Sequence, residues 1–184
     1  MVQLRHESYN VEGRPMGKIL GSWSGMRKYL EQEMLAESLK GRVRYSCTAY
    51  PGMDGSRIFE LCIDGRQIKR FSWETVNSYF IDTGISPQPK NNYWDNFLPL
   101  LERIPVTERD AHTDEEFCEA LAAYRAQEIH ISLSSENPLI RMFAVLDRRV
   151  GKRSLEKLKD TIPNQPSWLQ DIYLLRLRAE GVIK

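Results

Sequence analysis

Apolar positions are densest between residues 139 and 146, where seven of eight side chains are apolar and only Arg141 interrupts the run. A helix that is apolar on every side has to be buried, so this pattern predicts the central packing helix of the molecule. Asn137 and Pro138 are expected to begin it, because asparagine caps helices well and proline is tolerated in the first turn. Gly151 is expected to end it.

The first third of the chain shows a helical repeat. Apolar residues recur at helical spacing from a serine cap at Ser22 or Ser24 as far as Leu39, and Gly41 follows as a stop. This segment is predicted to be one helix. Residues 1–20 show only weak periodicity and are expected to form a partly ordered leader.

Three strands are predicted after this helix. Apolar and polar residues alternate at 43–50 and again at 59–63, and the PGMDG stretch between them is typical of a loop. The Asp64-Gly65 pair then suits a two-residue hairpin turn that needs positive φ at both central positions. This turn predicts that Leu61 lies opposite Ile68.

The remainder is predicted to be mostly helical. Residues 71–80 should form a short helix, and connections at 81–92 and 104–112 flank a segment at 93–101. Any helix in that segment is short or kinked, because Pro99 interrupts it.

Cap residues mark the later helices. Thr113 and Glu116 have the spacing of a capping box, in which each side chain bonds the other residue's backbone amide. Residues 129–133 are predicted to extend the preceding helix, with a short strand as the alternative. Ser154 is predicted to cap a short helix, and Pro166 to begin the last one.

These elements predict an α+β fold, in which an N-terminal helix and a three-stranded antiparallel sheet precede a helical C-terminal half. Residues 21–184 are expected to form a single domain, since 184 residues suit one domain or two small ones. Within it, 21–80 hold the helix and sheet, 81–112 connect, and 113–184 form the helical half. The two halves are expected to share one core.

Charge is balanced overall but uneven along the chain. Residues 1–80 carry 12 Lys and Arg against 9 Asp and Glu, residues 81–137 carry 4 against 11, and residues 138–184 carry 10 against 5. One interpretation is that the acidic middle packs beside the basic end. The other is that the molecule exposes two faces of opposite sign.

The number of cysteines and the hydropathy of the chain indicate in which cellular compartment the protein is expected. Cys47, Cys62 and Cys118 are odd in number and widely spaced, which favours a reducing cytosol over a disulfide framework or structural zinc. The first 20 residues lack the apolar core of a secretory signal, and no apolar run reaches membrane-spanning length. A cytoplasmic protein without membrane attachment, metal or cofactor is predicted.

Four segments carry a resemblance to known sequences: the helix that Trp23 begins, SLKGRVRY at 38–45, DRRVGKR at 147–153 and YLLRLRAEGV at 173–182. Together they resemble a family of small bacterial proteins of unknown function, over roughly Trp23 to the C-terminus. The resemblance implies that this stretch is one unit, and it implies no catalytic residues. Residues 81–112 depart most from the family's pattern.

The main candidate site is the basic corner, which we define as Arg148, Arg149, Lys152 and Arg153. These residues span the expected C-terminus of the buried helix and the turn beyond it. Cations stabilise a helix C-terminus through the helix dipole, which would explain the run without a ligand. Clustered arginines equally suit bidentate contacts with phosphates or carboxylates, which would make the corner a site for an anion or an acidic partner.

Other polar residues have simpler explanations. Arg141 and Asp147 lie on the buried helix, so each is expected to form an internal salt bridge with the acidic middle or the last helix. The acidic run at 114–119 is expected to be a solvated helix start, where carboxylates are favoured. The histidines are isolated, and the sequence contains no nucleophilic, metal-binding or phosphate-binding motif.

Tyr93 and Trp94 are candidate interface aromatics. They belong to an aromatic group that is either a satellite core under the long connection or an exposed anchor for a partner.

These features favour binding over catalysis. The predicted function is an intracellular interaction protein that engages a protein partner through the aromatic segment and the basic corner. The alternative is RNA or DNA binding through the basic corner, joined by Arg42 and Arg44, and an enzyme without a recognisable motif is the third hypothesis. The helix–three strands–helix order is similar to that of double-stranded RNA-binding domains, although residues 71–80 carry Glu74 and no lysine cluster.

Overall fold

The structure is a computed structural model, which describes residues 22–49, 57–85, 100–101 and 103–184. The predicted leader and the candidate aromatics Tyr93 and Trp94 lie outside the described residues. The first half contains α1 (Trp23–Lys28), the π-helical turn η2 (Tyr29–Glu33), the 3₁₀ turn η3 (Glu37–Leu39), β1 (Val43–Ala49), β2 (Arg57–Ile63), β3 (Arg66–Phe71) and α2 (Trp73–Asp82).

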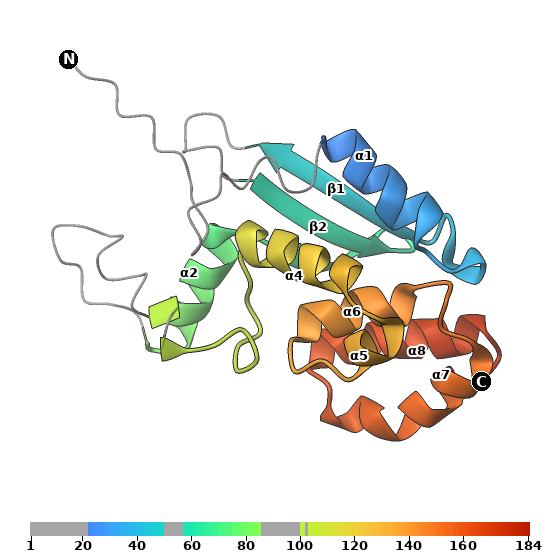
Figure 1. The fold of residues 1–184 in the computed structure, drawn as a ribbon. Coiled ribbons are helices and arrows are strands. Elements are labelled where there is room, and N and C mark those ends of the chain that lie inside the picture. The colour runs from blue at the N-terminus through green and yellow to red at the C-terminus, as the bar shows by residue number, and fades with distance from the viewer. Residues whose placement is uncertain (1–21, 50–56, 86–99, 102) are drawn as a thin grey trace, which may run out of the picture.

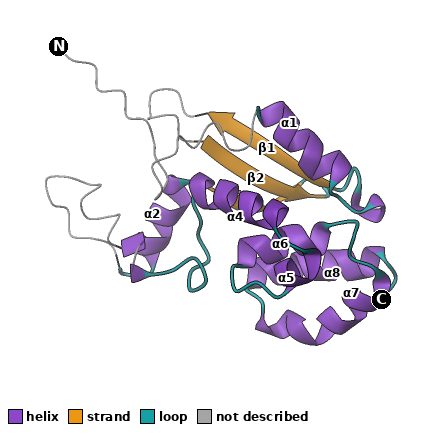
Figure 2. Ribbon diagram, viewed as in Figure 1, coloured by secondary structure: helices purple, strands orange, loops and turns teal. Residues whose placement is uncertain are grey.

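The second half contains α4 (Asp114–Ala126), α5 (Ile129–Leu133), α6 (Pro138–Leu146), α7 (Lys152–Leu158), the 3₁₀ turn η4 (Lys159–Asn164) and α8 (Ser167–Ala179). α1 and α4 pack on the sheet, while α5 to α8 gather beside it (Figure 1). The predicted α+β class is confirmed, with strands confined to the first half of the described residues (Figure 2).

The three strands form an antiparallel sheet in the order β1-β2-β3. Tyr45 on β1 lies opposite Leu61 on β2. The predicted hairpin turn between β2 and β3 is confirmed, because Asp64 and Gly65 both have positive φ, at 50° and 80°.

The predicted register of β3 is wrong by one residue. A β-bulge at Leu61 and Cys62 shifts the pairing, so that Leu61 lies opposite Lys69 and not Ile68. One extra residue turns the following side chains to the other face of the sheet. Lys69 is therefore buried, and Ile68 is only partly buried.

The aromatic ring of Phe117 on α4 joins the sheet to the helices. Its centroid lies 4.8 Å from those of Phe59 and Phe71 on the sheet and 5.3 Å from that of Phe143 on α6. Phe117 is fully buried, and the aromatic contacts that it makes span both halves of the chain.

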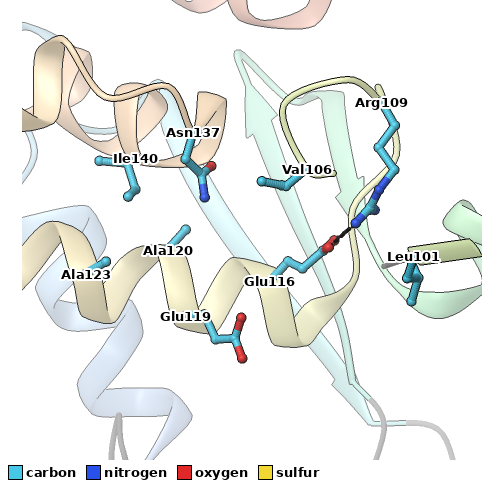
Figure 3. A pocket seen from close by; sticks show the side chains of 9 residues that line it. All are labelled: Leu101, Val106, Arg109, Glu116, Glu119, Ala120, Ala123, Asn137 and Ile140. Carbon is cyan, nitrogen blue, oxygen red and sulfur yellow. Dashed lines mark hydrogen bonds and ion pairs between the residues drawn. The ribbon is translucent and has the colours of Figure 1, made fainter. Parts of the chain in front are cut away.

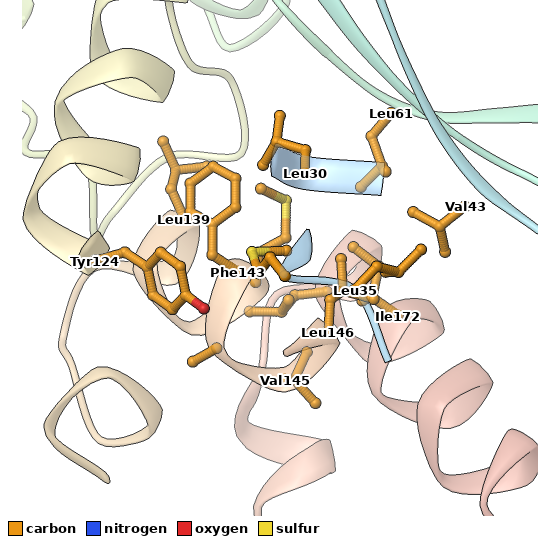
Figure 4. Close-up of a cluster of buried hydrophobic side chains, with 14 of the residues drawn as sticks. Leu30, Leu35, Val43, Leu61, Tyr124, Leu139, Phe143, Val145, Leu146 and Ile172 are labelled. Atoms are coloured by element: carbon orange, nitrogen blue, oxygen red, sulfur yellow. The ribbon is translucent and has the colours of Figure 1, made fainter. Parts of the chain in front are cut away.

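α6 is the buried helix that the apolar run predicted. Every one of its residues except Arg141 is buried. Figure 4 shows Phe143 and Leu146 of this helix among apolar side chains of the N-terminal segment and of α8, including Leu35 and Ile172.

Two helix ends differ from the prediction. The first helix does not reach Leu39, because the chain extends at Ala36 before η3 begins. α6 ends at Leu146, since Asp147 has an extended backbone, so Gly151 does not end it. Gly151 is instead the N-cap of α7, which places Ser154 inside that helix and not at its start.

Several predicted caps are confirmed. Ser22 caps α1, Thr113 and Glu116 make both hydrogen bonds of the capping box at α4, and Asn137 caps α6. Residues 129–133 are helical as predicted, but they form α5, which is separate from α4 and does not extend it.

Candidate functional site

The turn that carries the basic corner is fixed by the backbone of a distant segment. The Arg148 amide donates to the Met34 carbonyl (2.9 Å), and the Ala36 amide donates to the Leu146 carbonyl (3.0 Å). These two bonds flank an antiparallel bridge between Leu35 and Asp147. The position of the turn is therefore set by backbone hydrogen bonds and not by its own side chains.

Asp147 anchors Arg149. The carboxylate, which is 2% exposed, accepts from the Arg149 guanidinium at Nε (2.9 Å) and Nη2 (2.7 Å) and from its backbone amide (2.6 Å). Asp147 therefore has the internal partner that was expected, but the charged partner is two residues away and not in the acidic middle or in α8. Nη1 of Arg149 bonds no other described residue.

Tyr124 at the end of α4 completes this anchor. Its hydroxyl donates to Asp147 and accepts from Arg149 Nη2 (3.1 Å). Burial and the neighbouring Asp147 carboxylate raise the pKa of Tyr124 far above its usual range, so the phenol keeps its proton. Three hydrogen bonds to two side chains, Asp147 and Tyr124, thus hold the guanidinium in position.

Tyr29 lies beside this anchor. It is the first residue of the π-helical turn, which is closed by the Met34 amide donating to the Tyr29 carbonyl (2.8 Å). The Arg125 guanidinium lies 4.6 Å from the centre of its ring. Burial raises the pKa of Tyr29, and the positive charges of Arg125 and Arg149 oppose that rise. Such π-helical turns are frequent at functional sites.

The remaining cations of the basic corner are exposed and not neutralised. Arg148 and Arg153 form no ion pair or side-chain hydrogen bond with the described residues. Lys152 donates to the Gly181 carbonyl at 3.5 Å and forms no ion pair with them, although its charge contributes to the lowered pKa of Glu180. None of the ion pairs between described residues joins the acidic middle to the basic end.

Helix-end electrostatics does not explain Lys152 and Arg153. They lie in the first turn of α7, where the helix dipole disfavours cations, and not at a helix C-terminus as expected. Sequence reasoning missed Tyr29, Tyr124 and Arg125, because only the fold brings them beside residues 147–149.

Comparison with protein families gives one match. Residues 22–177 match the SF0329 protein family. The chain belongs to the SF0329 protein family. This confirms the expected resemblance to a family of unknown function, and the match includes the DRRVGKR run at 147–153 but not the last seven residues. No curated protein and no solved structure matches the chain.

Arg42 and Arg44, at the start of β1, were expected to join the basic corner of this SF0329 family member, and their environments differ. Arg42 just before the strand bonds Asp64 in a bidentate pair, at 2.9 and 2.7 Å. Arg44 is exposed and bonds no described side chain. Of the two positions expected to assist nucleic-acid binding, one is therefore neutralised.

The acidic run is not simply a solvated helix start. Asp114 is buried and accepts from the Arg57 amide (2.9 Å), and Glu116 bonds Arg109. Burial, with the neighbouring Asp114 carboxylate, raises the pKa of Glu115 to about 7. Only Glu119 is exposed as expected.

Arg141 is the other polar residue of the buried helix. It bonds Gln165 Oε1 (2.9 Å) and the carbonyls of Ser135 and Glu136, and its charge interacts with Tyr173 on α8. Partners in the acidic middle and in the last helix are therefore present as expected, but they are neutral groups and form no salt bridge. Burial lowers the pKa of Arg141. This side chain ties α6 to its neighbouring loops.

A buried lysine and a buried histidine lie together under α8. The Lys69 amine donates to the Asp110 carbonyl and lies 4.5 Å from the centre of the Trp168 ring. The His112 ring lies 5.8 Å from the same ring. Burial lowers the pKa of Lys69 to about 8 and that of His112 to about 3. Sequence reasoning missed both, since only the bulge in the sheet turns Lys69 inward.

Within the part of the chain that the structure describes, His, Cys, Asp and Glu side chains form no group of three or more that could hold a metal ion. No helix among the described residues is long and apolar enough to cross a membrane.

Proposed function

We propose that this protein is a non-catalytic binding protein whose basic corner docks on an acidic surface of a protein partner. The observation that carries the proposal is the combination of a fixed turn and unneutralised charge. Arg148, Lys152 and Arg153 are exposed without a carboxylate partner among the described residues, and Arg149 is held by Asp147 with Nη1 free.

A fixed position favours binding. Side chains that are already ordered lose less conformational entropy when a partner arrives. The backbone bonds at Arg148 and the carboxylate at Arg149 supply this order at two neighbouring positions. Cations that face a complementary acidic surface also accelerate encounter and select the partner.

The small extent of the charge favours a protein over a nucleic acid. The four cations lie within six residues, and exposed residues of both signs, Glu156 and Lys157, follow them on α7. Nucleic acids bind along extended positive grooves. Arg42 was expected to lengthen the positive surface of the basic corner, but Asp64 neutralises it. Tyr93 and Trp94 lie outside the described residues and stay in the proposal as aromatic anchors.

One observation supports the nucleic-acid alternative. The Tyr29 ring with Arg125 beside it lies next to the Arg149 anchor, and aromatic rings among cations are typical of single-stranded nucleic-acid binding. Both hypotheses place the ligand at the basic corner, so one set of variants tests them.

The test is fluorescence anisotropy at low and physiological salt. The probes are a labelled 12-residue Glu-rich peptide, a labelled single-stranded RNA and a labelled double-stranded DNA. The binding variant reverses Arg148, Lys152 and Arg153 to glutamate together and spares Arg149, because a glutamate beside Asp147 would disturb the anchor. The control reverses Arg66, Arg103 and Lys159, which are also exposed and form no ion pair with described residues.

We expect the peptide to bind, and the triple reversal to weaken its binding at least about tenfold while the control changes it less than about twofold. Preferential, steeply salt-dependent RNA or DNA binding that the same reversal abolishes would replace the protein proposal with the alternative. Equal effects of both variants would show that the basic corner is not the site.

We also infer that the protein acts in the cytoplasm of a bacterial cell. Cys47, Cys62 and Cys118 are all free thiols, which suits a reducing compartment. The resemblance of the DRRVGKR run and its companion segments supports the bacterial origin. Fractionation of cells that produce the native protein, followed by immunoblotting, tests the location.

A further inference from the structure

A pocket lies on the side of α4 next to the start of α6. Its volume is about 340 Å³, and its walls come from α4, the start of α6 and the residues Leu101, Val106 and Arg109. Figure 3 shows these three walls around one open space. The volume falls within the range of sites that bind small organic molecules.

Five of the nine lining residues are apolar, while polar atoms make up the larger part of the exposed lining. Ala120 and Ala123 lie one turn apart on α4, and their small side chains leave room above the helix. Val106, Leu101 and Ile140 complete the apolar surface. An aromatic ring or a short aliphatic chain suits such a lining.

Arg109 is not available to a ligand. Its guanidinium donates to the Ile104 carbonyl (3.0 Å), the Ala111 carbonyl (2.8 Å) and both carboxylate oxygens of Glu116. The two opposite charges cancel, and Arg109 is 4% exposed. This ion pair is therefore a rigid part of the wall.

The uncompensated charge of the pocket is the carboxylate of Glu119. It bonds no other described residue, and it is exposed at the edge of the pocket. Burial and the nearby Glu116 carboxylate raise the pKa of Glu119, so a cation bound there would relieve an existing repulsion.

Asn137 supplies a hydrogen-bond donor. Its Oδ1 accepts from the Leu139 amide (2.9 Å) as the helix cap, which leaves Nδ2 without a bond to any described residue. Figure 3 shows the amide group directed from the start of α6 toward α4. A hydroxyl or carbonyl oxygen on a ligand could accept from it.

We propose that this pocket binds a small primary amine with a compact apolar body and one oxygen acceptor. The ammonium group pairs with Glu119, the apolar body lies over Ala120 and Ala123, and the acceptor receives a hydrogen bond from Asn137. This site is separate from the basic corner, and it takes a ligand of the opposite charge.

The test is an NMR titration of the ¹⁵N-labelled protein with tyramine and with tyrosol, which has the same skeleton but a hydroxyl in place of the ammonium group. We expect tyramine to shift the amides of Ala120, Ala123 and Val106 and to bind about fivefold or more tightly than tyrosol. Equal affinities, or shifts that map elsewhere, would overturn the proposal.

Variants locate the site. Glu119→Gln should remove the preference for tyramine, and Ala123→Phe should weaken both compounds by filling the space. Glu115→Gln, on the same helix but outside the lining, is the matched control and should change neither affinity. Thermal unfolding verifies that each variant folds, which is expected because Glu119 and Ala123 are exposed. A preference that survives Glu119→Gln would contradict the assigned cation site.

Discussion

Asp147 shows how a single buried side chain organises the candidate site. Its carboxylate is almost fully buried, and a buried charge is costly unless it is paired and hydrogen-bonded. Three groups pair and hydrogen-bond this carboxylate: the Arg149 guanidinium, the Arg149 backbone amide and the Tyr124 hydroxyl. The same contacts that stabilise Asp147 therefore fix the orientation of Arg149.

Asp147→Asn is predicted to lower the free energy of unfolding by about 2 kcal/mol, because it removes a charged acceptor from a network of buried hydrogen bonds. Urea denaturation followed by circular dichroism measures the change. Arg148→Gln, one residue away but exposed, is the control and should stay within about 0.5 kcal/mol of the natural protein. Similar losses in both variants would refute the anchoring role of Asp147.

In β3, a bulge in the sheet changes which side chains face the core. Simple alternation predicted Ile68 on the core side, yet the bulge turns Lys69 inward, against Trp168. Lys69 forms no ion pair with the described residues, and burial lowers its pKa more than the nearby Asp110 carboxylate raises it. The free energy lost by burying this charged amine should appear in the pH dependence of the unfolding free energy.

Lys69 has a pKa of about 8 in the folded protein, below its ordinary value of 10.5. Between these pH values the unfolded chain binds more protons, so this group makes stability rise with pH. We predict that the unfolding free energy of the natural protein increases from pH 8 to pH 10 relative to that of Lys69→Met. Urea titrations at each pH measure it, and Lys159→Met, at an exposed position, should follow the natural protein.

If the natural protein and Lys69→Met show parallel curves over this range, Lys69 is charged and solvated in the folded state. That outcome would leave the low pKa of the neighbouring His112 in place, because burial is its main cause and a charged Lys69 lowers it further.

At the scale of the molecule, one cluster of buried apolar side chains contains residues of both halves. Phe117 occupies its middle, in contact with Phe59 and Phe71 on one side and Phe143 on the other. Because the sheet and α6 pack on the same ring, we expect the described part of the chain to unfold in one cooperative step.

Phe117→Ala is predicted to destabilise the whole molecule by about 3–5 kcal/mol, since it leaves a cavity between the sheet and the helices. Denaturation curves from far-ultraviolet circular dichroism and from tryptophan fluorescence should coincide in the natural protein and shift together in the variant. Tyr79→Ala, on the separate small cluster around α2, should cost less. Curves that separate would indicate two independent units.

The sequence by itself determined the features that depend on near neighbours. The caps at Ser22, Thr113 and Asn137, the Asp64-Gly65 turn and the burial of α6 all follow from residues within one or two turns of each other. Such signals act on the local backbone before any distant contact forms, which is why the α+β class could be predicted.

Only the tertiary structure decided which distant residues meet. α6 ends at Leu146 and not at the predicted stop, Gly151, and the Arg148 amide that follows bonds the distant Met34 carbonyl. The bulge in the sheet buries Lys69. The basic corner was visible in the sequence, but the Tyr124 and Tyr29 side chains beside it were not. Contacts of this kind depend on how whole elements pack, because the free energy of burial is shared among segments that no local pattern relates.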